Sequence, residues 1–119
     1  MKMISPKFHA VLDYLMVMLL LASPDIFGLS KTASTLAYTL GIIHFLLTIT
    51  TNFSGGIFKI INLKLHGLIE FFVSITLVIL AFTLFKGNLT DEIFYACLGL
   101  LILIIFTLTD YKRSLPVIL

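Results

Sequence analysis

Four long apolar stretches, separated by short polar clusters, constrain this 119-residue chain more than any other feature. They cover residues 8–22, with an extension through Pro24 to residue 27, and residues 33–51, 65–85 and 93–108. A helix needs about 20 apolar residues to cross a hydrocarbon core of about 30 Å. The sequence therefore predicts an all-α polytopic membrane protein, with four transmembrane helices in a single domain over residues 1–119.

The composition excludes several classes of protein. Hydrophobic residues make up 60% of the chain and charged residues 12%, whereas about 25% of an ordinary soluble domain is charged. A net charge of +2 is too small to drive binding to a nucleic-acid backbone. The single cysteine, Cys97, excludes an intrachain disulfide and a cysteine-based zinc site.

Local signals predict where the helices begin. Ser5-Pro6 places a capping hydroxyl before a proline in the first turn, and Asn62 can cap the third helix. Thr90, followed by Asp91 and Glu92, is the expected start of the fourth helix. The four tyrosines lie near the ends of the stretches, which predicts interfacial anchors: Tyr14, Tyr38, Tyr95 and Tyr111.

The chain also contains an internal repeat. Residues 7–14 (KFHAVLDY) match residues 64–71 (KLHGLIEF), and residues 51–53 (TNF) match residues 109–111 (TDY). The repeats span about residues 5–54 and 62–112, and each contains two helices. Because an even number of spans preserves direction, the sequence predicts two tandem parallel repeats in a four-helix bundle with approximate twofold symmetry.

These motifs resemble those of the SPW-repeat integral membrane proteins of bacteria. The resemblance is carried by the two His-x-x-x-acid-aromatic helices, by Ser23-Pro24 followed by Phe27-Gly28, and by the two-span repeat. The chain has Asp25 where the family has tryptophan, and Ala81-Phe82 where the second repeat has Pro-Trp. The resemblance implies the fold and a bacterial inner membrane, and it implies no activity.

The basic residues predict the orientation. Six lie on the side shared by both termini and the central loop (Lys2, Lys7, Lys59, Lys64, Lys112 and Arg113), and two lie on the other side (Lys31 and Lys86). Since cytoplasmic loops carry the excess of Lys and Arg, we expect a multi-pass protein of the bacterial inner (cytoplasmic) membrane with both termini in the cytoplasm.

Ionisable residues inside the predicted helices form the candidate site. His9 and Asp13, like His66 and Glu70, are four residues apart and share a helix face. His44 lies on a small, polar face of the second helix, so the sequence predicts one polar cluster facing the bundle interior. Further polar candidates are Thr48 and Thr51 on that face and Asp110 at the interface.

The cluster has three interpretations. Buried His and acid groups relay protons in transporters, which favours proton or small-solute transport. A non-catalytic structural or assembly protein would use the His/acid pairs to fix helix packing. Imidazole and carboxylate also suit Zn, Fe or Mn, which makes a metal site the third interpretation. No catalytic triad or phosphate loop is present, so we expect no enzyme and no cofactor. The expected partners are membrane lipids and, for a transporter this small, a second copy of the chain, with no nucleic acid.

Overall fold

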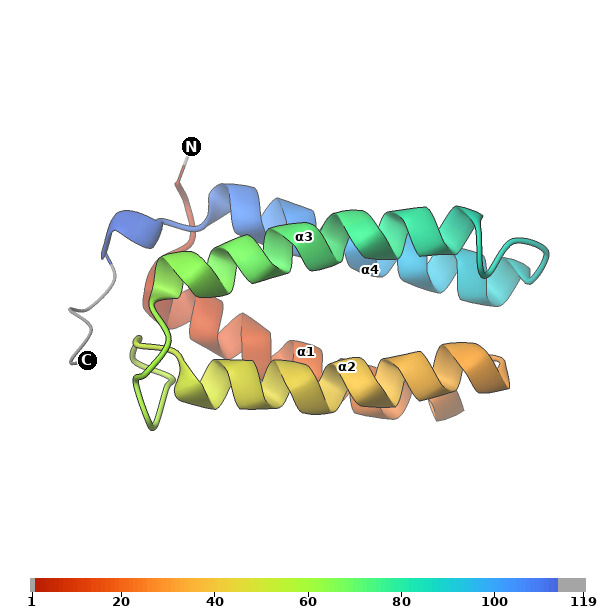
Figure 1. Ribbon diagram of the computed structural model, residues 1–119, viewed down its shortest axis with the longest axis horizontal. Coiled ribbons are helices and arrows are strands. Elements are labelled where there is room, and N and C mark those ends of the chain that lie inside the picture. The colour runs from red at the N-terminus through yellow and green to blue at the C-terminus, as the bar shows by residue number, and fades with distance from the viewer. Residues whose placement is uncertain (1, 114–119) are drawn as a thin grey trace.

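The computed structural model describes residues 2–113 and is built from four helices that run up and down in sequence (Figure 1). They are α1 (Pro6–Phe27), α2 (Lys31–Thr50), α3 (Leu63–Phe82) and α4 (Leu89–Leu108), followed by the short 3-10 helix η1 (Tyr111–Arg113). Each of the four long helices is long and apolar enough to cross a membrane. The prediction of an all-α polytopic membrane protein is confirmed, and the described residues contain no strand.

The helix boundaries follow local capping chemistry. The Ser5 hydroxyl accepts a hydrogen bond from the Phe8 N–H at the start of α1, and Asn62 caps α3 as predicted. α1 continues through Pro24 and ends where Gly28 adopts the left-handed conformation, with φ of 65°. The prediction that Thr90 starts α4 is wrong: the Asn88 side chain accepts the Asp91 N–H, which begins the helix earlier.

The helices form two antiparallel hairpins that face each other. α1 packs mainly on α2, and α3 packs mainly on α4 (Figure 1). Between the hairpins, the half of the bundle nearest the α1–α2 and α3–α4 loops is filled by an apolar core that includes Leu20, Ala37, Leu77 and Leu98. We call this half the loop end, and the opposite half, which carries the first and last described residues, the terminal end.

Two bonds join the hairpins at the loop end. The Asp91 carboxylate accepts the Ser30 N–H at 3.0 Å, and the Tyr95 hydroxyl donates to the Ala33 carbonyl at 2.6 Å. Tyr95 is fully buried and stacks on Phe85 with a ring-centroid distance of 4.7 Å. The prediction that Tyr95 is an interfacial anchor is therefore wrong, because its ring is buried and its hydroxyl is bonded to the backbone of α2.

The outer surface of the bundle is apolar. Large side chains along all four helices are exposed, among them Leu15, Ile42, Phe72 and Ile104. Such a continuous apolar surface is unfavourable in water and matches the hydrocarbon core of a bilayer.

Two reciprocal backbone pairs close the terminal end. Ile4, just before α1, pairs with Thr109, just after α4; Ile61, just before α3, pairs with Thr51, just after α2. Ile4 and Ile61 occupy equivalent positions in the two sequence repeats, as do Thr51 and Thr109. The residue before the first helix of each repeat therefore pairs with the residue after the last helix of the other repeat, as expected from a twofold arrangement.

Candidate functional site

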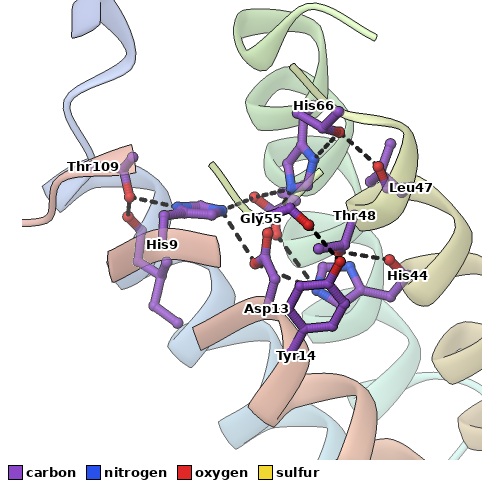
Figure 2. Close-up of polar contacts among 12 residues, drawn as sticks. His9, Asp13, Tyr14, His44, Leu47, Thr48, Gly55, His66 and Thr109 are labelled. Atoms are coloured by element: carbon purple, nitrogen blue, oxygen red, sulfur yellow. Dashed lines mark hydrogen bonds and ion pairs between the residues drawn. The ribbon is translucent and has the colours of Figure 1, made fainter. Parts of the chain in front are cut away.

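The segment between α2 and α3 folds back over the terminal end. The backbone N–H of Asn52 donates to the Ile61 carbonyl at 2.7 Å. The Tyr14 hydroxyl donates to the Gly55 carbonyl at 2.6 Å, as Figure 2 shows. A Cβ atom on Gly56 would lie 1.7 Å from the Thr51 carbonyl oxygen, so only glycine fits this turn. This fold places the buried Phe53 ring over the histidines of α1 and α3, with centroid distances of 6.3 Å to His9 and 5.6 Å to His66.

His9 and His66 are fully buried and make matching contacts across the two repeats. The Nδ1 atom of His9 lies 2.8 Å from the Thr109 hydroxyl, and the Nδ1 atom of His66 lies 2.7 Å from the Thr51 hydroxyl. The two hydroxyls donate in turn to main-chain carbonyls one helical turn earlier, at Ile105 and Leu47, both at 2.6 Å (Figure 2). Each histidine of one repeat is therefore positioned by a threonine of the other.

These contacts determine which imidazole nitrogen carries a proton. A threonine hydroxyl has one hydrogen, and here it is already donated to a carbonyl oxygen. The hydroxyl must therefore accept from the histidine, so Nδ1 carries the hydrogen in both rings. In the neutral rings, the Nε2 atoms of His9 and His66 then present lone pairs to the bundle interior.

The two carboxylates lie directly in front of these Nε2 atoms. The His9 Nε2 atom is 2.9 Å from Glu70 Oε1 and 3.2 Å from Asp13 Oδ1. The His66 Nε2 atom is 3.0 Å from Asp13 Oδ2 and 3.3 Å from Glu70 Oε1. Each histidine thus meets both the acid of its own helix and the acid of the other repeat, and all four residues are buried.

Hydrogen bonds between these residues satisfy only part of the site. The contact between His9 Nε2 and Glu70 has the geometry of a hydrogen bond. In contrast, Asp13 Oδ2, His44 Nε2 and His66 Nε2 are buried and form no hydrogen bond with any residue that the structure describes. Four ligand atoms, one each from His9, Asp13, His66 and Glu70, lie within 4.8 Å of one another. Convergent, unsatisfied lone pairs of this kind are what a bound cation requires.

His44 adds a third imidazole from α2. Its Nε2 atom is 3.4 Å from Asp13 Oδ1 and 3.9 Å from Glu70 Oε2. Its side chain has a relative exposure of 13%. The equivalent position in the second repeat is Ile102, so only one hairpin supplies this ring. A cavity of about 50 Å³ lies beside His44 and Glu70 toward the loop end, and apolar residues such as Met16, Leu77 and Ile102 line the rest of it.

The structure thus brings together all five residues of the predicted cluster: His9, Asp13, His44, His66 and Glu70. Among the further polar candidates, Thr51 positions His66, and the Thr48 hydroxyl donates to the His44 carbonyl at 2.8 Å. Asp110 is outside the cluster, and its carboxylate accepts the Lys112 backbone N–H at 3.1 Å.

Two residues of the site are missing from the sequence prediction. Thr109 orients His9, and Tyr111 covers the same ring at a centroid distance of 5.9 Å. Burial raises the pKa of the Tyr111 hydroxyl above its ordinary value, so the ring that covers His9 is uncharged at neutral pH. The repeat contains the signal for both, since Thr109 and Tyr111 occupy the positions of Thr51 and Phe53.

Comparison of the chain with protein-family models, with curated proteins and with solved structures gives no match.

Proposed function

We propose that this membrane protein binds a divalent transition-metal ion at the cluster of His9, Asp13, His66 and Glu70, with His44 as an additional ligand. The observation that supports this most is the convergence of lone pairs. Two Nε2 atoms, whose rings are held in one tautomer by threonine hydroxyls, face carboxylate oxygens at 2.9–3.3 Å. Acceptors this close repel one another unless a proton or a metal ion lies among them, and a single divalent ion would satisfy both histidines and both acids at once.

The spacing suits a metal ion. With bonds of about 2.0–2.1 Å, neighbouring ligands of a tetrahedral zinc ion lie about 3.3 Å apart, which resembles the N–O separations of the cluster. Metal-bound histidines usually donate their second ring N–H to an oxygen atom of the protein. Thr109 and Thr51 supply that oxygen for His9 and His66.

The charge balance also favours a divalent ion. Two carboxylates, three neutral imidazoles and one M²⁺ ion sum to zero, which limits the cost of burial inside a bilayer. A mixed set of imidazole and carboxylate ligands is suited to zinc, iron or manganese. The small cavity beside His44 and Glu70 adjoins the cluster and leaves room for a water-sized ligand.

Metal content tests this proposal. The protein is purified in detergent without chelators, and bound metals are quantified by mass spectrometry before and after loading with Zn²⁺, Mn²⁺ or Co²⁺. We expect about one ion per chain, and a Co²⁺ absorption spectrum typical of nitrogen and oxygen ligands. The variant Asp13→Asn/Glu70→Gln should lose the ion and keep its helical circular dichroism. A folded parent protein that takes up no ion from any of these solutions would overturn the proposal.

Proton transport is the second candidate, because short contacts run without interruption from Thr109 through His9, the carboxylates and His66 to Thr51. Toward the loop end, however, the cluster meets the apolar core around Leu20, Leu77 and Leu98. A pathway would therefore need a second copy of the chain. Proton flux into vesicles that is abolished by Asp13→Asn, in protein without metal, would favour this candidate over metal binding.

We also propose that the protein is a member of the SPW-repeat family, in the bacterial inner membrane with both termini in the cytoplasm. The motif resemblance and the distribution of lysines support this assignment. A reporter fused after Leu119 should behave as cytoplasmic, and one inserted near Gly87 as external.

A further inference from the structure

A groove with a volume of about 380 Å³ opens at the terminal end, beside the ends of α3 and α4. Basic, acidic and apolar residues line it: Lys2, Lys64, Leu68, Phe106, Asp110, Tyr111 and Lys112. We propose that this groove binds the phosphate-bearing headgroup of an anionic phospholipid. The inference does not depend on the metal proposal, because none of the five cluster residues lines the groove, and Tyr111, which lies between His9 and the groove, is no ligand in that proposal.

The charge of the rim favours a phosphate. The rim carries three exposed lysines and one carboxylate, that of Asp110. The lysines are Lys2 before α1, Lys64 in the first turn of α3 and Lys112 in η1. The Lys2 ammonium uses one of its three hydrogens for the Thr107 carbonyl, at 3.2 Å. Asp110 already accepts the Lys112 backbone N–H at 3.1 Å. The rim therefore retains a net positive charge with ammonium hydrogens to donate, which suits a phosphate oxygen.

The wall beneath the rim favours a lipid over a soluble anion. Leu68 lies one helical turn deeper than Lys64 on α3, and Phe106 is the corresponding apolar residue on α4. Leu68 is also part of the exposed apolar surface that would face acyl chains. A phospholipid fits this arrangement, because its charged headgroup would lie among the lysines at the bilayer interface and its acyl chains would lie against Leu68 and Phe106.

The other repeat provides an internal comparison. The positions equivalent to Lys2, Lys64 and Lys112 are Lys59, Lys7 and Ser54. The Lys59 ammonium donates to a main-chain carbonyl, that of Phe53, at 2.6 Å, as Lys2 does to Thr107. The difference lies at Ser54, which has no positive charge. The three-lysine arrangement therefore occurs once among the described residues, although the fold repeats.

Lipid retention in native mass spectrometry tests the proposal. The full chain is reconstituted with phosphatidylglycerol and phosphatidylcholine, and the parent should retain phosphatidylglycerol preferentially. Each lysine near a membrane surface contributes about 1 kcal/mol to binding of anionic lipids. The variant Lys64→Gln/Lys112→Gln should therefore lower this preference by roughly tenfold or more, and Lys64→Arg/Lys112→Arg should retain it.

The matched control is Lys7→Gln/Lys59→Gln, which removes the same charge at the same end of the bundle. Neither lysine lines the groove, so this variant should lose clearly less of the preference than Lys64→Gln/Lys112→Gln. An equal loss in both glutamine variants would show a general surface-charge effect and overturn the proposal. No preference in the parent protein, or displacement of the lipid by millimolar inorganic phosphate, would overturn it as well. Circular dichroism of each variant verifies that the helices are intact.

Discussion

The α1–α2 and α3–α4 hairpins share the same polar frame but differ in what they add to it. Each supplies one buried histidine, one acid four residues later and one threonine for the histidine of the other hairpin. The α1–α2 hairpin alone adds His44, where α3–α4 has Ile102. The shared residues therefore form the centre of the proposed cation site, whereas the third imidazole makes the site asymmetric.

The hairpins also differ in how closely their helices pack. Gly41 and Gly99 occupy equivalent repeat positions. A Cβ atom on Gly41 would meet the tip of the Leu21 side chain at 2.8 Å, whereas one on Gly99 would meet the main-chain oxygen of Ser74 at 2.8 Å. The α3–α4 pair thus brings backbone against backbone, and α1–α2 keeps a side chain between its helices.

The largest expected effect concerns the two acids. If the hairpins contribute equally, Asp13→Asn and Glu70→Gln should each lower metal affinity by more than about a hundredfold, because each removes a charged ligand of the same ion. Competition titration with a chromogenic chelator measures this. Asp25→Asn, on the exposed face of α1, is the control. An effect confined to one of the two acids would contradict a shared site.

The next largest effect concerns the threonines. Thr51→Val and Thr109→Val keep the side-chain volume but remove the acceptor for the histidine Nδ1–H. Loss of such an outer contact typically lowers metal affinity by about 10–100-fold. Both variants should show similar losses in the same titration, with Thr39→Val on the exposed face of α2 as the control. Unchanged affinity in either variant would show that its histidine is oriented by something else.

The glycine comparison gives an effect on stability. Gly99→Ala should lower the free energy of unfolding by about 1–3 kcal/mol, since the helix backbones must separate to admit a methyl group. Gly41→Ala should lower it by less than about 1 kcal/mol, because the end of a leucine side chain can move aside. Unfolding in a denaturing detergent, monitored by circular dichroism, measures both values. Equal losses would contradict the difference in packing.

The smallest effect concerns the asymmetry itself. His44→Ile gives the α1–α2 hairpin the residue found at the equivalent position of α3–α4. Since the His44 Nε2 atom lies 3.4 and 3.9 Å from the two carboxylates, outside the shorter contacts of His9 and His66, affinity should fall by about tenfold, at the low end of the range for an outer contact. The Co²⁺ absorption spectrum should nevertheless change as one nitrogen ligand is lost. An identical spectrum would place His44 outside the coordination sphere.

Much of this architecture can be predicted from the sequence. The four helices follow from apolar stretches long enough to cross a bilayer, and the polar cluster follows from the spacing of His9 with Asp13 and of His66 with Glu70. Their convergence is predictable because the repeat places both pairs at the same depth, where charged groups avoid lipid.

Contacts between the hairpins are harder to predict. Thr109 orients His9, and Tyr95 donates to Ala33, because of how the segments cross in space. Hydropathy marks Tyr95 only as an aromatic residue near a helix end, and it marks Thr109 only as polar. The cap of α4 differs from the prediction for a local reason. Asparagine is a stronger N-cap than threonine, so Asn88 caps the helix ahead of Thr90.

The two histidine–threonine contacts are equivalent in the folded protein, but their partners are synthesised at different intervals. His66 finds its hydroxyl partner 15 residues earlier in the chain, so that contact can form as soon as α3 enters the membrane. His9 must wait for a partner that is synthesised 100 residues later. In a bilayer, helices insert first and associate afterwards. During synthesis, therefore, the first histidine to be made is the last to be oriented, and the cluster becomes complete only when translation has passed residue 109.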